Sequence, residues 1–145
     1  YVEPLNKWLE NHVYASKDEL SIFFRDITEK KLAEQRIMEE KQLSESIINS
    51  LPGIFYFFDD NGKYIRWNKN LETVTGYSTE EIAAIHPLTF VPEEEKELIS
   101  KNIAAVFTRG STEVESLLLT KDGRKIPYYL NGYAGNFNGK QCLLG

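Results

Sequence analysis

The side chains that could do chemistry in this chain are few and far apart. The two histidines, His12 and His86, have no second histidine, cysteine or carboxylate at the spacing of a metal site, so we expect no bound metal. The single thiol, Cys142, lies in an apolar run, where cysteine usually serves as a small buried hydrophobic residue. One cysteine also excludes an internal disulfide, which suits a reducing compartment.

Two groups of acidic residues could be read as catalytic carboxylates. Asp59 and Asp60 are adjacent, but Asn61-Gly62 follows them, and such a run is typical of a hairpin turn. No base or nucleophile can be identified beside them. The run Glu93–Glu95 follows Pro92 and favours a helix start, where negative charge is stabilised. The sequence also has no G-x-S-x-G motif and no P-loop, so we expect no enzyme activity in this fragment.

Turn signals and apolar spacing predict the elements that hold these residues. Ser78 and Glu81 form a capping box, and glycines end two of the helices. Strands are predicted at residues 5–15, 20–25, 54–58, 63–67, 112–120, 124–134 and 140–144. Helices are predicted at residues 28–50, 68–75, 79–84 and 92–109, the last with Pro92 in its first position.

The helix over residues 28–50 is the longest element, at about 35 Å. Its apolar stripe is thin, which favours a two-stranded coiled coil or a connector between domains. Its first half could equally lie solvated against its own domain. Its end, from Leu43 to Leu51, is more apolar, and we expect it to dock on the domain that follows.

The order of elements predicts an α+β fold. The two strands after the long helix and the three closing strands can form one five-stranded antiparallel sheet, with the helices on one face. The early hairpin and the connector helix precede it. A hairpin alone is marginal in water, so this one must pack on something.

Composition restricts the partners and the location. The chain has 145 residues, enough for one domain and an appendage, with 41% hydrophobic and 27% charged residues. A net charge of −5 argues against nucleic acid as a partner. No apolar run is long enough to span a membrane within this fragment, and no signal peptide is visible. We expect a cytoplasmic piece of a longer protein that could itself be membrane-anchored.

Several short motifs, taken in order, resemble a PAS domain over residues 46–145. They are the turn at Asp59–Gly62, Asn68 after the second strand, Gly76-Tyr77-Ser78-x-x-Glu81-Ile82, His86-Pro87 and Lys121-Asp122-Gly123. The resemblance is greatest to PAS units of bacterial sensor histidine kinases and diguanylate cyclases. It implies that His86, beside Pro87, is structural.

The first 27 residues resemble the last two strands and closing D-I-T motif of a preceding PAS unit, which makes a weak internal repeat. The resemblance therefore divides the chain into a hairpin at residues 1–27, a signalling helix at 28–50 and a PAS domain at 51–145 whose last strand is truncated. We expect the hairpin to pack on a dimer partner or to take part in strand exchange.

The resemblance also implies a ligand pocket between the sheet and the helices. Ordinary core packing explains the same side chains equally well. The expected pocket residues are Phe55, Phe57, Trp67, Asn68, Leu71, Val74, Ile82, Ile85, Phe90, Ile103, Phe107, Leu117, Leu119, Tyr128, Leu130 and Tyr133, with every strand face uncertain by one residue.

The cofactor of such a pocket is unknown from the sequence. The flavin photosensors of the family need a cysteine in the helix after the second strand, and here that run begins Asn68-Lys69-Asn70-Leu71. The haem branch needs a histidine on the long later helix, and residues 92–109 contain none. Flavin and haem are therefore both disfavoured.

The function that the resemblance implies is that of a sensory relay module in a signal-transduction protein. A small ligand or a dimer contact would change how the sheet holds the flanking helix, which then biases an output domain further along the parent chain. A ligand-free structural dimerisation module is the alternative. In both cases we expect a homodimer, with dimer and signalling contacts made by Leu32, Ile37, Leu43, Ile47, Ile48 and Leu51.

Overall fold

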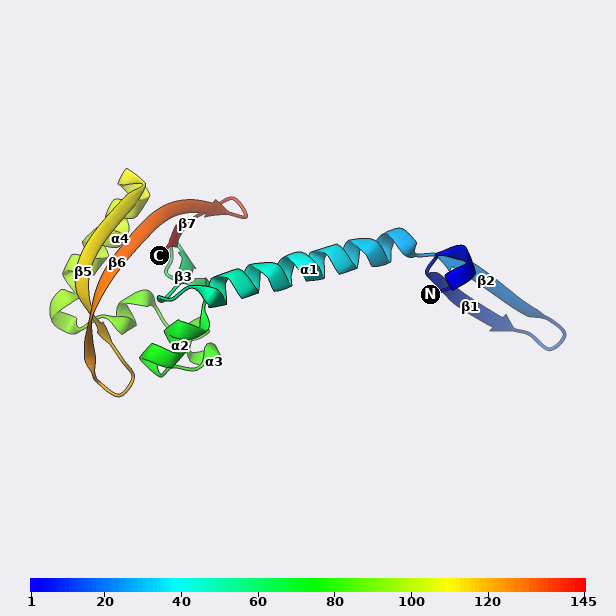
Figure 1. The fold of residues 1–145 in the computed structure, drawn as a ribbon, viewed down its shortest axis with the longest axis horizontal. Coiled ribbons are helices and arrows are strands. Elements are labelled where there is room, and N and C mark those ends of the chain that lie inside the picture. The colour runs from blue at the N-terminus through cyan, green and yellow to red at the C-terminus, as the bar shows by residue number, and fades with distance from the viewer. The chain divides into compact units, whose positions relative to one another are not determined.

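The computed structural model describes all residues from 1 to 145, and it divides into two compact units at Ser46/Ile47. Helix α1 runs through this boundary (Figure 1). The strands are β1 (Leu9–Ala15), β2 (Leu20–Asp26), β3 (Tyr56–Asp59), β4 (Tyr64–Trp67), β5 (Ser111–Leu119), β6 (Lys125–Phe137) and β7 (Lys140–Leu144). The helices are α1 (Thr28–Ser50), α2 (Lys69–Thr75), α3 (Thr79–Ala84) and α4 (Lys96–Arg109), with short 3-10 helices at Glu3–Leu5, Pro87–Phe90 and Glu93–Glu95.

The first unit contains an antiparallel hairpin that forms a sheet of its own. In the register of β1 and β2, Val13 pairs with Ile22 and His12 with Phe23, so apolar side chains lie on both faces. The prediction that the first strand begins at Leu5 was wrong. Asn6 has a left-handed backbone with φ of 49°, which interrupts the extended chain, and the strand begins only at Leu9.

The joint between the hairpin and α1 is tied by side chains. Asp26 accepts a hydrogen bond from the Thr28 backbone N–H at 3.0 Å and forms an ion pair with Lys7 at 2.7 Å. The Thr28 hydroxyl oxygen in turn accepts a bond from the backbone N–H of Trp8 at 2.9 Å. These contacts fix the start of α1 at the residue that the sequence predicts. None of the helices is both long and apolar enough to cross a membrane.

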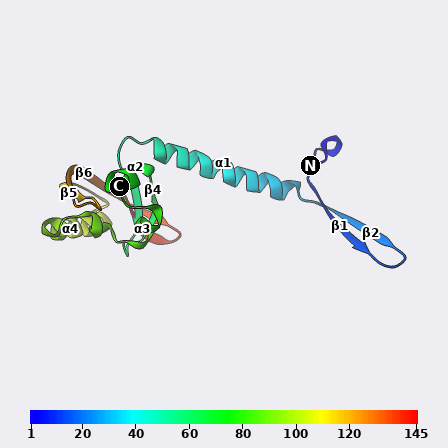
Figure 2. The same ribbon diagram turned by 90° about the horizontal axis from the view of Figure 1, so that it is seen from below.

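The second unit is built on one five-stranded antiparallel sheet, as the sequence predicts. Its strand order is β4-β3-β7-β6-β5, so the last strand lies in the middle. Helix α4 packs against β5, β6 and β7, and Figure 2 shows it along one side of β5 and β6. Helix α3 lies against β4. The mixed helix-and-strand fold and its sheet are therefore confirmed.

The short helices begin and end where local chemistry predicts. The Asn68 side chain caps α2, and Gly76 ends it with φ of 77°. Ser78 and Glu81 form the expected reciprocal capping box on α3. Gly110 ends α4 in the left-handed region with φ of 92°.

The start of α4 differs from the prediction. Pro92 precedes a separate 3-10 turn at Glu93–Glu95, and α4 begins at Lys96. The cause is the Glu95 side chain, whose carboxylate accepts bonds from the Ser116 hydroxyl at 2.5 Å and the Leu117 backbone N–H at 2.8 Å. These two bonds hold the acidic turn against β5 and lower the pKa of Glu95.

Candidate functional site

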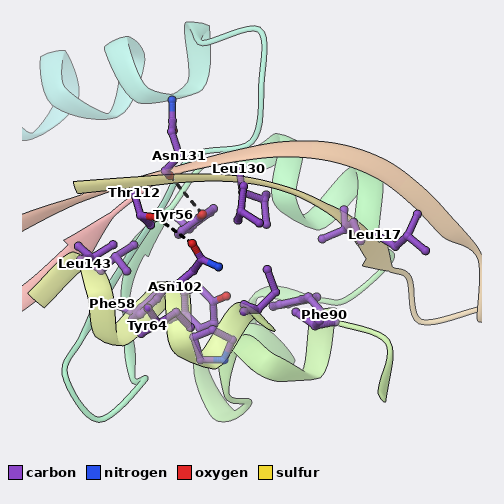
Figure 3. Close-up of a pocket in the computed structure, with 18 residues that line it drawn as sticks. Tyr56, Phe58, Tyr64, Phe90, Asn102, Thr112, Leu117, Leu130, Asn131 and Leu143 are labelled. Carbon is purple, nitrogen blue, oxygen red and sulfur yellow. Dashed lines mark hydrogen bonds between the residues drawn. The ribbon is translucent and has the colours of Figure 1, made fainter. Parts of the chain in front are cut away.

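A cavity of about 80 Å³ lies among the sheet, α4 and the segment that precedes α4 (Figure 3). Strand β3 contributes the alternate residues Tyr56 and Phe58, β5 and β6 also contribute neighbouring residues, and α4 contributes residues at the spacing of one helix face. The wall is formed by Tyr56, Phe58, Tyr64, Pro87, Phe90, Val91, Ile99, Asn102, Ile103, Val106, Thr112, Val114, Leu117, Leu118, Leu130, Asn131, Gly132 and Leu143. None of these side chains carries a charge.

An aromatic cluster holds one end of the wall rigid. The Tyr64 ring makes edge-to-face contacts with Phe58 at 5.7 Å, Trp67 at 5.9 Å and Phe90 at 6.0 Å between ring centroids. Such pairs stabilise beyond the area that they bury, by about 0.5–1.5 kcal/mol each. Tyr64 is therefore held in one orientation from several sides.

The polar groups of the wall differ in how well they are paired. Thr112 donates to the Asn102 side-chain oxygen at 2.8 Å, and the Asn102 amide donates to the Leu98 carbonyl at 2.9 Å. The Tyr56 hydroxyl donates to the Asn131 carbonyl over a long 3.4 Å. No fully buried side-chain polar atom lacks a hydrogen-bond partner, so the Tyr64 hydroxyl, which has no bond within the chain, keeps contact with solvent.

Both phenols are neutral over the physiological pH range. Burial raises the pKa of Tyr56 to about 12. Burial also raises the pKa of Tyr64 far above its ordinary range, and the nearby Tyr56 phenol adds to this shift. A neutral phenol can donate one hydrogen bond, so the wall offers hydroxyl donors in apolar surroundings.

Four of the expected pocket residues line this cavity. They are Phe90, Ile103, Leu117 and Leu130. Seven others belong to the core or pack against it without lining the cavity. They are Trp67, Leu71, Val74, Ile82, Ile85, Phe107 and Tyr128. Asn68 is 1% exposed and lies at the start of α2. The remaining residues, Phe55, Phe57, Leu119 and Tyr133, do not line the cavity either.

The difference on β3 is a shift of one residue. Tyr56 and Phe58 line the cavity in place of Phe55 and Phe57. Four aromatic residues follow one another at 55–58, so alternation of apolar and polar side chains could not indicate the buried face. On α4, the spacing of Ile99, Asn102, Ile103 and Val106 is a signal that could have found the helical wall.

A second group of interest joins the end of α1 to the start of α2 through three asparagine side chains. We call Asn49, Asn68 and Asn70 the asparagine clamp. Asn68 donates to the carbonyls of Gly53 at 2.8 Å and Ile48 at 3.4 Å. Asn70 donates to the carbonyls of Leu51 at 2.9 Å and Gly53 at 3.0 Å.

Hydrogen bonds of the clamp run from the start of α2 to the end of α1 and also from α1 to α2. The Asn49 side-chain oxygen accepts a bond from the Lys69 backbone N–H at 2.9 Å, in the first turn of α2. Each helix thus satisfies terminal backbone groups of the other that have no partner within their own helix. The Asn68 side-chain oxygen also accepts from the backbone N–H of Phe55 at 3.0 Å and of Leu71 at 3.3 Å.

The expected signalling residues of α1 are mostly exposed. The exposed fractions are 46% for Leu32, 67% for Ile37, 63% for Leu43, 55% for Ile47 and 40% for Leu51. Ile48 is half-buried. The apolar stripe therefore has no covering partner within this chain.

The two histidines and the cysteine, the other residues considered for chemistry, have structural roles or no evident role. The Nδ1 of His86 accepts a bond from the Leu88 backbone N–H at 3.2 Å and caps the 3-10 helix Pro87–Phe90. His12 lies 3.1 Å from Glu10 on the hairpin. Cys142 is fully buried, and burial raises the pKa of its thiol. No three His, Cys, Asp or Glu side chains come together as a metal site.

Comparison with known proteins supports the fold described above and identifies the family of the chain. Among solved structures, the PAS domain of an HTR-like protein from Haloarcula marismortui has a TM-score of 0.69 at 18% identity, covering 79% of this chain and 94% of that chain. A PAS domain from Desulfitobacterium hafniense has a TM-score of 0.62 at 20% identity, covering 68% and 93%. A domain of a sensory box sensor histidine kinase/response regulator from Geobacter sulfurreducens has a TM-score of 0.62 at 14% identity, covering 74% and 94%.

A comparison with curated proteins gave no match. The family model described as PAS domain matches residues 52–141, which is more than half of the chain. The match includes the cavity wall from Tyr56 to Gly132 and the clamp residues Asn68 and Asn70. A PAS domain is typically a regulatory sensory module and not a catalytic one. This chain belongs to the PAS domain family.

Proposed function

We propose that this chain is a cytoplasmic sensory and signal-relay module of a bacterial signal-transduction protein of the histidine kinase or diguanylate cyclase type. In this proposal the PAS domain passes a conformational change to α1, and the flanking helices bias an output domain elsewhere in the parent chain. The observation that carries the proposal is the asparagine clamp, because it links the domain to the end of α1 by directional bonds.

One hydrogen bond of the clamp reaches the backbone residue next to the cavity wall at the start of β3. The Phe55 N–H is bonded to the Asn68 side chain, and the next residue, Tyr56, lines the cavity. On the other side, the Leu71 N–H is bonded to Asn68, and Leu71 belongs to the buried core. A shift of β3 would therefore change the bonds of Asn68, which also holds the Ile48 carbonyl of α1.

The second part of the proposal is a homodimer formed through α1. Leu43 and Ile47 are four residues apart and lie on one side of the helix, and both are more than half exposed. Burying such a stripe against a second copy would remove apolar area from water, at about 25 cal/mol per Å². A two-stranded coiled coil is the arrangement that fits a long helix with a narrow stripe.

The dimer can be tested with two matched double variants. Leu43→Glu with Ile47→Glu places charges in the stripe, whereas Gln42→Glu with Ser46→Glu adds the same charge one residue away. Sedimentation equilibrium should show dissociation for the first variant and little change for the second. An unchanged dimer fraction in the first variant would remove α1 from the proposed mechanism.

The alternative is a structural dimerisation module that binds no ligand. The size of the cavity favours it, because about 80 Å³ is well below the roughly 300–1,000 Å³ of typical ligand pockets. A thermal-shift screen with small metabolites distinguishes the two functions. Stabilisation by any compound of the panel would contradict the ligand-free alternative, and so would an absorption band of a bound flavin or haem.

A further inference from the structure

Three asparagines of this chain, Asn61, Asn131 and Asn138, are each followed by a glycine. Asparagine is a thermolabile residue, because the backbone nitrogen of the next residue can attack its side-chain amide. A following glycine hinders this attack least, since it has no Cβ. The reaction also needs water at that nitrogen, which must lose its proton before it attacks. The surroundings of the three glycines therefore decide which asparagine can react.

Two of the glycine nitrogens are protected by the fold. Gly62 is buried, its N–H donates to the Asp59 carbonyl at 2.9 Å, and the His86 ring lies against it. Gly132 is also buried, because it pairs with Thr112 in the ladder of β5 and β6 and packs against the side of α4. Burial leaves little room for water at either nitrogen.

The turn Asn138-Gly139 has different surroundings. Both residues are exposed, and they connect β6 to β7 without belonging to either strand. Their φ values of 50° and 76° are those of a two-residue type I′ hairpin turn. The Gly139 N–H makes no hydrogen bond within the chain, and nothing lies within 4 Å of a Cβ built at this glycine. The Gly139 nitrogen is therefore open to water.

We propose that Asn138 is a site of covalent modification, at which the chain deamidates by reaction with its own backbone and with water. The Gly139 nitrogen bonds to the side-chain carbonyl carbon of Asn138. The side-chain amide leaves as ammonia, which takes up the proton lost from the Gly139 N–H. Water then opens the resulting cyclic imide at either of its carbonyls. The products are aspartate and isoaspartate, in which the main chain runs through the former side chain.

The two products differ in their effect on the sheet. Aspartate followed by glycine suits the same turn as asparagine does. Isoaspartate adds one carbon atom to the backbone of a two-residue turn, and the length of this turn sets the pairing of Phe137 with Lys140. Strand β7, which follows the turn, is the central strand and pairs with both β6 and β3. Amide hydrogens of residues 140–144 should therefore exchange faster in the isoaspartate form than in the unmodified chain.

Incubation of the chain from residue 1 to 145 at mildly alkaline pH, folded and in urea in parallel, tests the inference. Peptide mapping by mass spectrometry locates each new aspartate and isoaspartate. In urea all three asparagines should convert at similar rates. In the folded chain Asn138 alone should convert, at a rate that rises in proportion to the hydroxide concentration.

Two matched variants check the location. Asn138→Ser should lose the acidic product that anion-exchange chromatography separates from the unmodified chain. Asn61→Ser replaces the other asparagine that lies in an exposed turn, and this variant should form the product at the rate of the unaltered chain.

Three results would overturn the inference. They are an unmodified Asn138 in the folded chain after a time that converts it in urea, conversion of Asn61 or Asn131 as fast as that of Asn138 in the folded chain, and the same amount of acidic product in Asn138→Ser. Unchanged hydrogen exchange over residues 140–144 in the purified isoaspartate form would contradict the stated effect on β7. None of these results affects the test of the α1 dimer, so the two proposals can fail separately.

Discussion

The imidazole of His86 lies directly against the backbone of Gly62. A Cβ added at Gly62 would come within 2.3 Å of the Cδ2 and Nε2 atoms of His86. The ring is held there because its Nδ1 accepts the Leu88 backbone N–H. This contact joins the β3–β4 turn to the segment that precedes α4, and it gives His86 a packing role.

Gly62→Ala should destabilise the domain by about 3 kcal/mol or more, because it adds a clash to a strained backbone. Gly139→Ala is the matched control. Both glycines have φ of 76°, but nothing lies within 4 Å of a Cβ at Gly139. The control should lose only about 1–2 kcal/mol. Urea unfolding measures both, and equal losses would mean that the His86 contact is unimportant.

Breaking the asparagine clamp should loosen the end of α1. Asn68→Ala removes bonds at a residue that is 1% exposed and should cost about 2–4 kcal/mol of unfolding free energy. Asn70→Ala should cost about 1 kcal/mol. Hydrogen exchange at residues 48–51 should accelerate in both variants. Asn136→Ala, at an exposed position of β6, is the control, and similar exchange in all three would contradict a role for the clamp.

The pKa of Asp26 provides a test of the joint before α1. Its carboxyl pKa is lowered to about 2 by hydrogen bonds from Lys7 and Thr28. A lowered carboxyl pKa stabilises the folded joint above the unfolded value of about 3.9, and this stabilisation is lost as the pH falls through the folded value near 2. Asp26 is exposed, so salt should weaken the effect.

Lys7→Met should move the Asp26 titration midpoint upward toward its ordinary value, and carbon-detected NMR can follow it. Lys17→Met, in the turn of the hairpin, is the control and should leave the midpoint unchanged. A midpoint that stays near 2 in Lys7→Met would assign the shift to Thr28 and not to Lys7.

Leu143→Ala should enlarge the cavity from the sheet side. Leu143 is 3% exposed and lines the wall, so its truncation should cost about 2–5 kcal/mol. Leu98→Ala on α4, where the side chain is 46% exposed, should cost about 0.5 kcal/mol or less. Thermal unfolding distinguishes them. A loss in Leu143→Ala equal to that in Leu98→Ala would argue that the wall collapses freely.

Local chemistry made much of this fold predictable. The capping box of Ser78 and Glu81, the glycine ends of α2 and α4, and the Gly- and Pro-free run of α1 each specify an element by themselves. Long-range contacts decided the rest. The Glu95 carboxylate bonds to β5, which lies more than twenty residues later, and this separates the acidic turn from α4. Nothing within residues 92–96 signals that bond.

The cavity wall was only partly predictable for a related reason. The face of β3 depends on pairing across the sheet, where Phe58 lies opposite Leu143. A run of four aromatic residues gives no local indication of that register.

The central position of β7 has a consequence for how the domain is made. The β3–β4 hairpin and the β5–β6 hairpin are not neighbours in the sheet, and β7 alone connects them, through Phe57–Leu144 and Tyr133–Leu144. During synthesis, both hairpins leave the ribosome before the strand that unites them. Closure of the domain must wait for that last strand, and until then each hairpin presents an unpaired edge that chaperones or neighbouring chains can bind.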